Sequence, residues 1–150
     1  MSNDLAELLP ALAESIAISL QEGAFIMCWQ VDDTGELPAP VLYAEVAVRC
    51  AHRTLFVGIS VTNALARQVA QDTLGELDAA AIAQEDVRDA VLELANVVAG
   101  RLSRSVSHDG ALVSLSAPSL RVAPHPDGMH VAMATDGGEL IRCTLREAGP

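Results

Sequence analysis

The sequence predicts an α+β domain in which two units, each a helix followed by strands, surround an antiparallel-rich sheet. Three observations predict it. Apolar residues recur at helical spacing in three segments, alternate with polar residues in several others, and the helix-then-strands order occurs twice along the chain. A chain of 150 residues can bury a core without disulfides or metal, so we expect one domain, residues 1–150.

Three helices are expected, from their caps and their apolar spacing. In the first, Asp4 can serve as the cap and Gly23 lies just beyond the end, while Pro10 either kinks the helix or marks its start. The second has Thr62 or Asn63 near its start. The expected ranges are 4–21, 61–74 and 85–105.

The strands are expected where β-prone residues alternate and turn residues flank them. Residues 41–50 give the clearest alternation, with apolar side chains on one side and Tyr43, Glu45 and Arg49 on the other. The last two strands read as a hairpin. The expected strands are 24–31, 41–50, 54–60, 111–116, 120–123, 129–134 and 139–145. Turns are expected at 32–35, 124–128 and 136–138, with a Pro-Ala-Pro spacer at 38–40.

Composition and charge exclude several classes of function. Hydrophobic residues make up 51% of the chain but aromatics only 3%, which predicts a core of Val, Leu, Ile and Ala. A net charge of −11, with arginine as the only basic residue type and no arginine cluster, argues against nucleic acid as a partner. No apolar run approaches a membrane span, and no basic region precedes an apolar stretch, so we expect a soluble cytoplasmic protein.

Cysteines and histidines give no metal or catalytic pattern. The three cysteines are widely separated in apolar segments, which indicates reduced core thiols, and the four histidines are scattered. These residues are Cys28, Cys50, Cys143, His52, His108, His125 and His130. No glycine-rich phosphate loop or nucleophile elbow is present, so we expect no metal site and no cofactor held by the chain itself.

The third helix carries the best indication of function. Its apolar residues fall in one sector of the helix, while Asp89, Glu93, Asn96 and Gly100 fall in the opposite sector. Asn and Gly each weaken a helix interior, by up to roughly 1 kcal/mol relative to Ala. Glycine lets another backbone approach closely, and an amide both donates and accepts hydrogen bonds. The stripe is therefore either a docking surface or an ordinary solvated face.

The string Glu93-Leu-Ala-Asn96-Val-Val-Ala-Gly100 resembles the signature of the CheC/CheX/FliY family of chemotaxis phosphatases. An acidic residue, Asp89, stands four positions before Glu93, and Pro118 follows Asn96 by 22 residues, one fewer than the family usually shows. The element order also fits. A single Glu-x-x-Asn pair resembles the CheX branch, because CheC-type members carry two.

The resemblance implies a phosphatase that hydrolyses the aspartyl phosphate of a CheY-like response regulator. Asn96 would orient the attacking water, and Glu93 would pair with the regulator's active-site lysine. Asp89 would extend the acidic edge, and Gly100 would leave room for the regulator's loops. Magnesium is expected on the regulator and not on this chain. The resemblance further implies a homodimer formed through the sheet.

A non-catalytic binding module is the alternative. A CheX-like domain could dock a response regulator or kinase of a two-component pathway without hydrolysing anything. The two readings separate at one residue, because catalysis requires Asn96, whereas docking depends more on Glu93.

Overall fold

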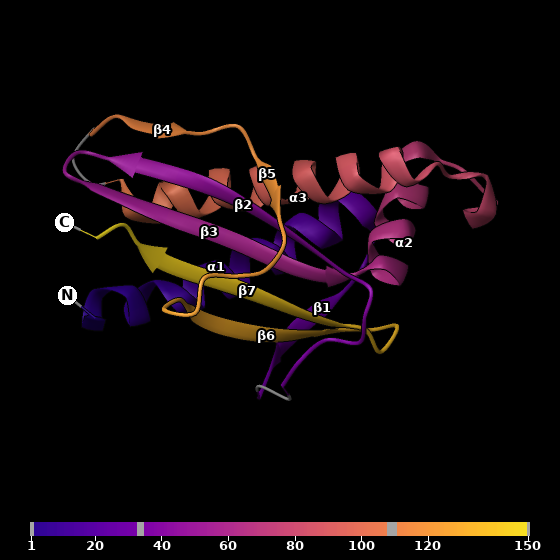
Figure 1. The fold of residues 1–150 in the computed structure, drawn as a ribbon, viewed down its shortest axis with the longest axis horizontal. Coiled ribbons are helices and arrows are strands. Elements are labelled where there is room, and N and C mark those ends of the chain that lie inside the picture. Colours follow the sequence, from indigo (N-terminus) through magenta and orange to yellow (C-terminus); the bar gives the residue numbers. More distant parts are fainter. Residues whose placement is uncertain (1, 33–34, 108–110, 150) are drawn as a thin grey trace.

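The chain forms two layers in the computed structural model, which describes residues 2–32, 35–107 and 111–149 (Figure 1). Within these residues, three α-helices cover one face of a seven-stranded sheet. The helices are α1 (Ser2–Ala24), α2 (Asn63–Leu74) and α3 (Gln84–Val106), with a short 3₁₀ turn, η1 (Ala79–Ala81), before α3. The strands are β1 (Cys28–Val31), β2 (Val41–Cys50), β3 (Arg53–Thr62), β4 (Val113–Leu115), β5 (Ser119–Arg121), β6 (Met129–Thr135) and β7 (Leu140–Glu147).

The sheet topology shows the duplication directly. Its order is β1-β6-β7-β3-β2, with β4 and β5 both paired to the outer side of β2, and every pairing is antiparallel. When β4 and β5 are counted as one interrupted strand, the first strand of each unit pairs with the second strand of the other, and the third strands, β3 and β7, meet at the centre. The predicted α+β class, with duplicated units around an antiparallel sheet, is confirmed.

The core lies between the sheet and the helices. Alternate residues of β2, β3 and β7 face the helical layer, and their side chains are almost fully buried. The largest fully buried side chains are leucine, isoleucine, methionine and valine, as the low aromatic content predicts. The hairpin of β6 and β7 and the strand at 41–50 also form where predicted.

Helix α1 differs from the prediction at both ends. Asp4 lies inside the helix and its Oδ2 pairs with Arg53 Nη1 at 2.5 Å, so the predicted cap is wrong. Pro10 also lies inside the helix, which continues past it and through Gly23 to Ala24. Burial of an apolar stripe from Leu12 onward keeps the helix in place despite the proline.

Because α1 runs further than predicted, β1 is shorter than predicted. Only residues 28–31 pair with β6, and residues 24–27 end the helix and lead into the sheet. Strand β3 is longer than predicted because it pairs with β2 along its whole length and with β7 over most of it. Thr62 caps α2, accepting a hydrogen bond from Leu65 N at 3.2 Å, as predicted. The predicted turn at 32–35 lies partly outside the described residues.

The remaining strands differ from prediction only in their ends. Strands β4 and β5 are each three residues long, shorter than predicted, while β6 and β7 extend slightly further. Helix α3 begins and ends within one residue of the predicted range.

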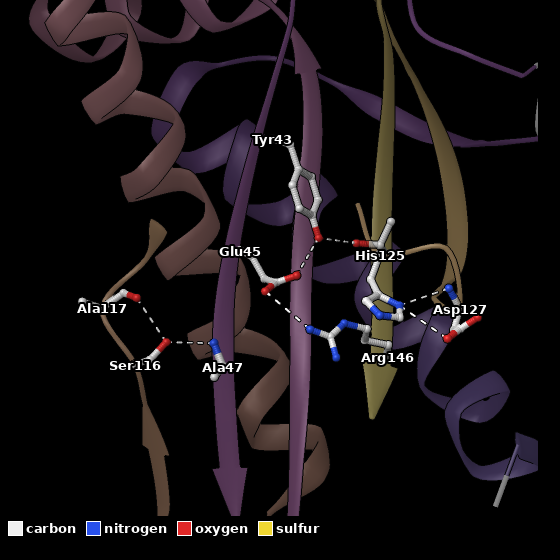
Figure 2. Close-up of polar contacts among 9 residues, drawn as sticks. Tyr43, Glu45, Ala47, Ser116, Ala117, His125, Asp127 and Arg146 are labelled. Atoms are coloured by element: carbon white, nitrogen blue, oxygen red, sulfur yellow. Dashed lines mark hydrogen bonds and ion pairs between the residues drawn. The ribbon is translucent and has the colours of Figure 1, made fainter. Parts of the chain in front are cut away.

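The sheet face away from the helices is closed by a polar network (Figure 2). Tyr43 Oη donates to Glu45 Oε2 at 2.9 Å and lies 3.2 Å from Thr144 Oγ1. Glu45 Oε1 lies 3.8 Å from Arg146 Nη2, and the Arg146 guanidinium stacks over the Phe56 ring. Burial raises the pKa of Tyr43 to about 12. The connection from β5 to β6 crosses this face in front of the central strands (Figure 1).

Gly58 allows this network to form, because the Tyr43 ring crosses directly above it. A Cβ at position 58 would lie 2.5 Å from Tyr43 Cε2, and closer still to Tyr43 Oη and Thr144 Oγ1. The ring is held by partners on both sides, so it has little room to move.

Gly58→Ala is expected to lower the free energy of unfolding by about 2–3 kcal/mol, the usual cost of overpacking a buried site. Urea unfolding measures it, with Gly23→Ala as control, since nothing lies within 4 Å of that added Cβ. The same substitution should cost much less in a background that carries both Tyr43→Ala and Thr144→Ala, which removes the three atoms that the added Cβ would meet. A loss for Gly58→Ala no larger than that for Gly23→Ala would contradict the steric argument.

Candidate functional site

Helix α3 carries the candidate site, and the burial of one side of this helix in the core fixes where the site lies. Eight of its residues are buried against β2, α1 and α2: Val87, Val91, Leu94, Ala95, Val98, Ala99, Leu102 and Val106. Burial of this stripe fixes the rotation of the helix about its axis. The opposite sector, with Asp89, Glu93 and Asn96, is therefore held outward by the core.

The three polar side chains of this sector have no partner within the part of the chain that the structure describes. Asp89 and Glu93 are exposed and Asn96 is partly exposed, and no hydrogen bond or ion pair engages their side chains there. Elsewhere the described surface does pair its charges, as Arg53 does with Asp4 and Glu147. Two carboxylates and an amide are thus presented on one helix, free to bind another molecule.

Glu93 lies between two hollows of the helical layer. One, between α2 and α3, is also lined by Asp86, Asp89 and Thr73. The other, of about 300 Å³, lies between α3, α2 and the C-terminal turn of α1. We call this second hollow the α1–α3 groove; its lining residues include Leu20, Glu22, Gly23, Ala24, Val69, Glu93, Leu94, Val97 and Arg101.

Asn96 and Gly100 lie on the side of α3 that meets β4 and β5. The position a Cβ would take on Gly100 is 3.8 Å from Leu115 Cδ1, and Asn96 is one helical turn earlier on the same side. The Leu115 side chain therefore borders the space that the missing side chain of Gly100 leaves open. Sequence reasoning missed this contact, because it joins a helix to a sheet edge.

The turn between β4 and β5, which contains Pro118, is tied to the edge of β2. Ser116 Oγ accepts from Ala47 N at 2.9 Å and donates to Ala117 O at 3.1 Å (Figure 2). Ser116 N also donates to Ala47 O at 2.9 Å. Because α3 packs beside β4 and β5, the fold brings the Pro118 turn to the same side of the molecule as Asn96.

The cysteines and histidines form no second site in the described residues. Cys50 and Cys143 are buried and Cys28 is half-buried, and all three are free thiols. Burial, and secondarily the nearby Asp136 carboxylate, raises the pKa of Cys28 to about 11, which keeps it a poor nucleophile at neutral pH. His52, His125 and His130 are exposed, and His108 lies outside the described residues.

Two searches of the described residues gave no further site. No group of three or more His, Cys, Asp or Glu side chains there could hold a metal ion. No helix among them is long and apolar enough to cross a membrane.

Solved structures with the same fold are CheX, CheC-like and FliY proteins. The chemotaxis protein CheX from Desulfovibrio desulfuricans is 18% identical over 95% of this chain and 99% of its own, with a TM-score of 0.73. CheX from Vibrio vulnificus is 17% identical over 93% and 97%, with a TM-score of 0.74. CheX in a CheX-CheY-BeF₃-Mg²⁺ complex from Borrelia burgdorferi is 14% identical over 97% and 98%, with a TM-score of 0.65.

The sequence itself identifies the family. Residues 46–124, just over half of the chain, match the family described as chemotaxis phosphatase CheX, and the chain belongs to this family. The matched region contains α3 and the Pro118 turn. No curated protein is significantly similar to the chain in sequence.

Gly100→Ala is expected to raise the free energy of unfolding by about 0.5–1 kcal/mol, because alanine favours the helix and its Cβ would make only an ordinary contact with Leu115. Thermal unfolding followed by circular dichroism measures this. A loss of stability would contradict it and show that Leu115 cannot adjust.

Proposed function

We propose that this protein hydrolyses the aspartyl phosphate of a CheY-like response regulator. The observation that carries the proposal is the free amide of Asn96 beside the free carboxylate of Glu93 on the outward sector of α3, in a chain of the CheX family. The Borrelia burgdorferi complex of CheX with CheY, BeF₃ and Mg²⁺ supports the choice of partner.

This chain needs to supply only a few groups for the reaction, because most of the reacting site belongs to the regulator. There, magnesium and a lysine neutralise charge on the phosphoryl group. Water attacks phosphorus, and the bond from phosphorus to the aspartyl oxygen breaks. The regulator keeps the aspartate carboxylate, and inorganic phosphate leaves with the oxygen and the protons of the water. This chain would hold no metal of its own.

Asn96 would hold the attacking water in line with the breaking bond. Its amide oxygen accepts a hydrogen bond from the water, and its amide nitrogen can donate to an oxygen in the same site. The gain comes from orientation, so the amide needs no change of protonation. Because α3 is fixed by its buried stripe, the amide is presented on a rigid element.

Glu93 would pair with the regulator's lysine and set the register of docking. It precedes Asn96 by three residues, which places the two side chains about 5–6 Å apart at their Cβ atoms and roughly 60° apart around the helix. Both can therefore reach one site at once. Asp89, one turn before Glu93, would extend the acidic edge, and Gly100 would allow the regulator's loops to approach beside Leu115.

The second candidate is a docking module that binds a response regulator or kinase without catalysis. Partial burial of Asn96 and the Pro118 spacing favour it. In either function we propose a cytoplasmic homodimer formed through the sheet, whose edges in the described residues are β1 on one side and β4 and β5 on the other.

Asn96→Ala is expected to lower kcat for dephosphorylation by about 10²–10³-fold with KM nearly unchanged, because only transition-state positioning is lost. The assay is the decay of radiolabelled aspartyl phosphate on CheY-like regulators from the same genome. Alanine favours a helix, so unfolding curves should show no loss of stability. Full activity of Asn96→Ala would overturn the assignment.

Glu93→Ala is expected to raise KM about tenfold or more, since a charge-assisted contact to lysine is removed. The matched control is Glu85→Ala, which removes an exposed carboxylate from the first turn of the same helix. An equal rise in KM for both variants would indicate that Glu93 acts through its negative charge alone and not by pairing with the regulator's lysine. Wild-type binding without any acceleration of decay, weakened by Glu93→Ala but not by Asn96→Ala, would establish the docking module.

Magnesium removal is expected to abolish catalysed decay, because the regulator needs the ion and this chain does not bind it. Chelation should stop the reaction, added magnesium should restore it, and calorimetric titration of magnesium into this chain without the regulator should give no heat of binding. Saturable binding to the isolated chain would contradict a site held entirely by the regulator.

A further inference from the structure

Helix α1 ends at Ala24 and is followed by a phenylalanine in a backbone conformation that normally belongs to glycine. Phe25 has φ of 56°, in the left-handed region, and Ile26 N donates to Leu20 O at 3.1 Å to close the last turn. A bulky residue is a genuine outlier there, because its Cβ crowds the backbone. Gly23, two positions earlier, remains inside the helix.

Packing does not compensate for this strain. The Phe25 residue is 83% exposed, although the whole chain has only four aromatic residues. The other described non-glycine residue with positive φ is Ala51, at 48° in the β2–β3 turn, and it has no large side chain to expose. The left-handed backbone of Phe25 and the exposure of its ring each lower the stability of the chain, which points to a use outside folding.

Phe25 directly follows the residues that line the α1–α3 groove. Gly23 and Ala24 share that lining with Glu93 and Val97, and the lining also includes apolar side chains such as Leu94. Glu93 thus belongs both to the proposed phosphatase site and to a groove that is lined at another point by Ala24. A protein that docks on Glu93 and fills this groove would reach the C-terminal turn of α1, which Phe25 directly follows.

We propose that Phe25 is a docking anchor, whose ring packs against an apolar patch of the receiver domain while the acyl phosphate lies at Asn96 and Glu93. This rests on the proposed function. Aromatic side chains beside well-packed grooves are typical anchors of protein interfaces. The occupant is a receiver domain because in the proposed function it brings a lysine to Glu93, whereas an anionic membrane would meet like charge on a chain of net charge −11.

The test is Phe25→Gly, which separates binding from folding. Glycine relieves the left-handed strain, so the thermal midpoint should rise, while KM for the phosphorylated regulator should rise about tenfold with kcat unchanged. Ala51→Gly is the matched control: it relieves left-handed strain at a position beside Asp4 and Leu8, near the start of α1 and not its end, and its KM should equal that of wild type. Phe25→Trp, which keeps an aromatic ring at this position, should have the same KM as wild type.

An unchanged KM for Phe25→Gly, with wild type active and Asn96→Ala inactive, would overturn the anchor and leave the proposed function standing. A raised KM for Phe25→Trp would also overturn it.

If wild type does not accelerate decay, the proposed function fails, and calorimetric binding of the beryllofluoride-activated regulator decides whether Phe25 is an anchor. Weaker binding by Phe25→Gly would support it, and equal binding, or none by wild type, would overturn it. A change in sedimentation for Phe25→Gly would overturn it in favour of self-association.

Discussion

The fold and the candidate site both depend on the burial of the apolar stripe of α3. This helix has Ala83 at its N-cap position, which supplies no side-chain cap, and it carries Asn96 and Gly100 in its interior, so its own propensity is modest. Packing against β2, α1 and α2 supplies the stability that propensity lacks. The same packing fixes the helix rotation. Any side chain that acts on a partner is therefore placed by the core, and not by contacts within the site.

The duplicated topology places α1 and α3 as counterparts in the two units, and they have diverged. Helix α3 carries the Glu-x-x-Asn pair, whereas α1 lacks it and contributes the end of the groove beside Glu93. In the proposed function, one unit would supply the chemistry and the other would shape the docking surface. A duplicated fold allows this division, because each helix is supported by the whole shared sheet.

The polar network around Tyr43 and the candidate site lie on opposite faces of the sheet. The face away from the helices is closed by Tyr43, Glu45 and Arg146 above Gly58, while Glu93 and Asn96 lie in the helical layer. Changes to one face should therefore have little direct effect on the other, since sites without shared partners are nearly additive. Phe25 is different, because there the requirements of folding and of the proposed docking oppose each other.

Local periodicity determined much of this protein from its sequence alone. The extents of α3 and β2, the outward position of Glu93 and Asn96, and the aromatic-poor core all follow from spacing and composition, since these depend on neighbouring residues. Tertiary structure decided the rest. The Asp4 carboxylate pairs with Arg53 instead of capping a helix, and α1 passes Gly23 to end at Ala24, because long-range packing outweighs local end signals. The contact of Leu115 with Gly100 and the groove beside Glu93 join segments far apart in the chain, which no local pattern encodes.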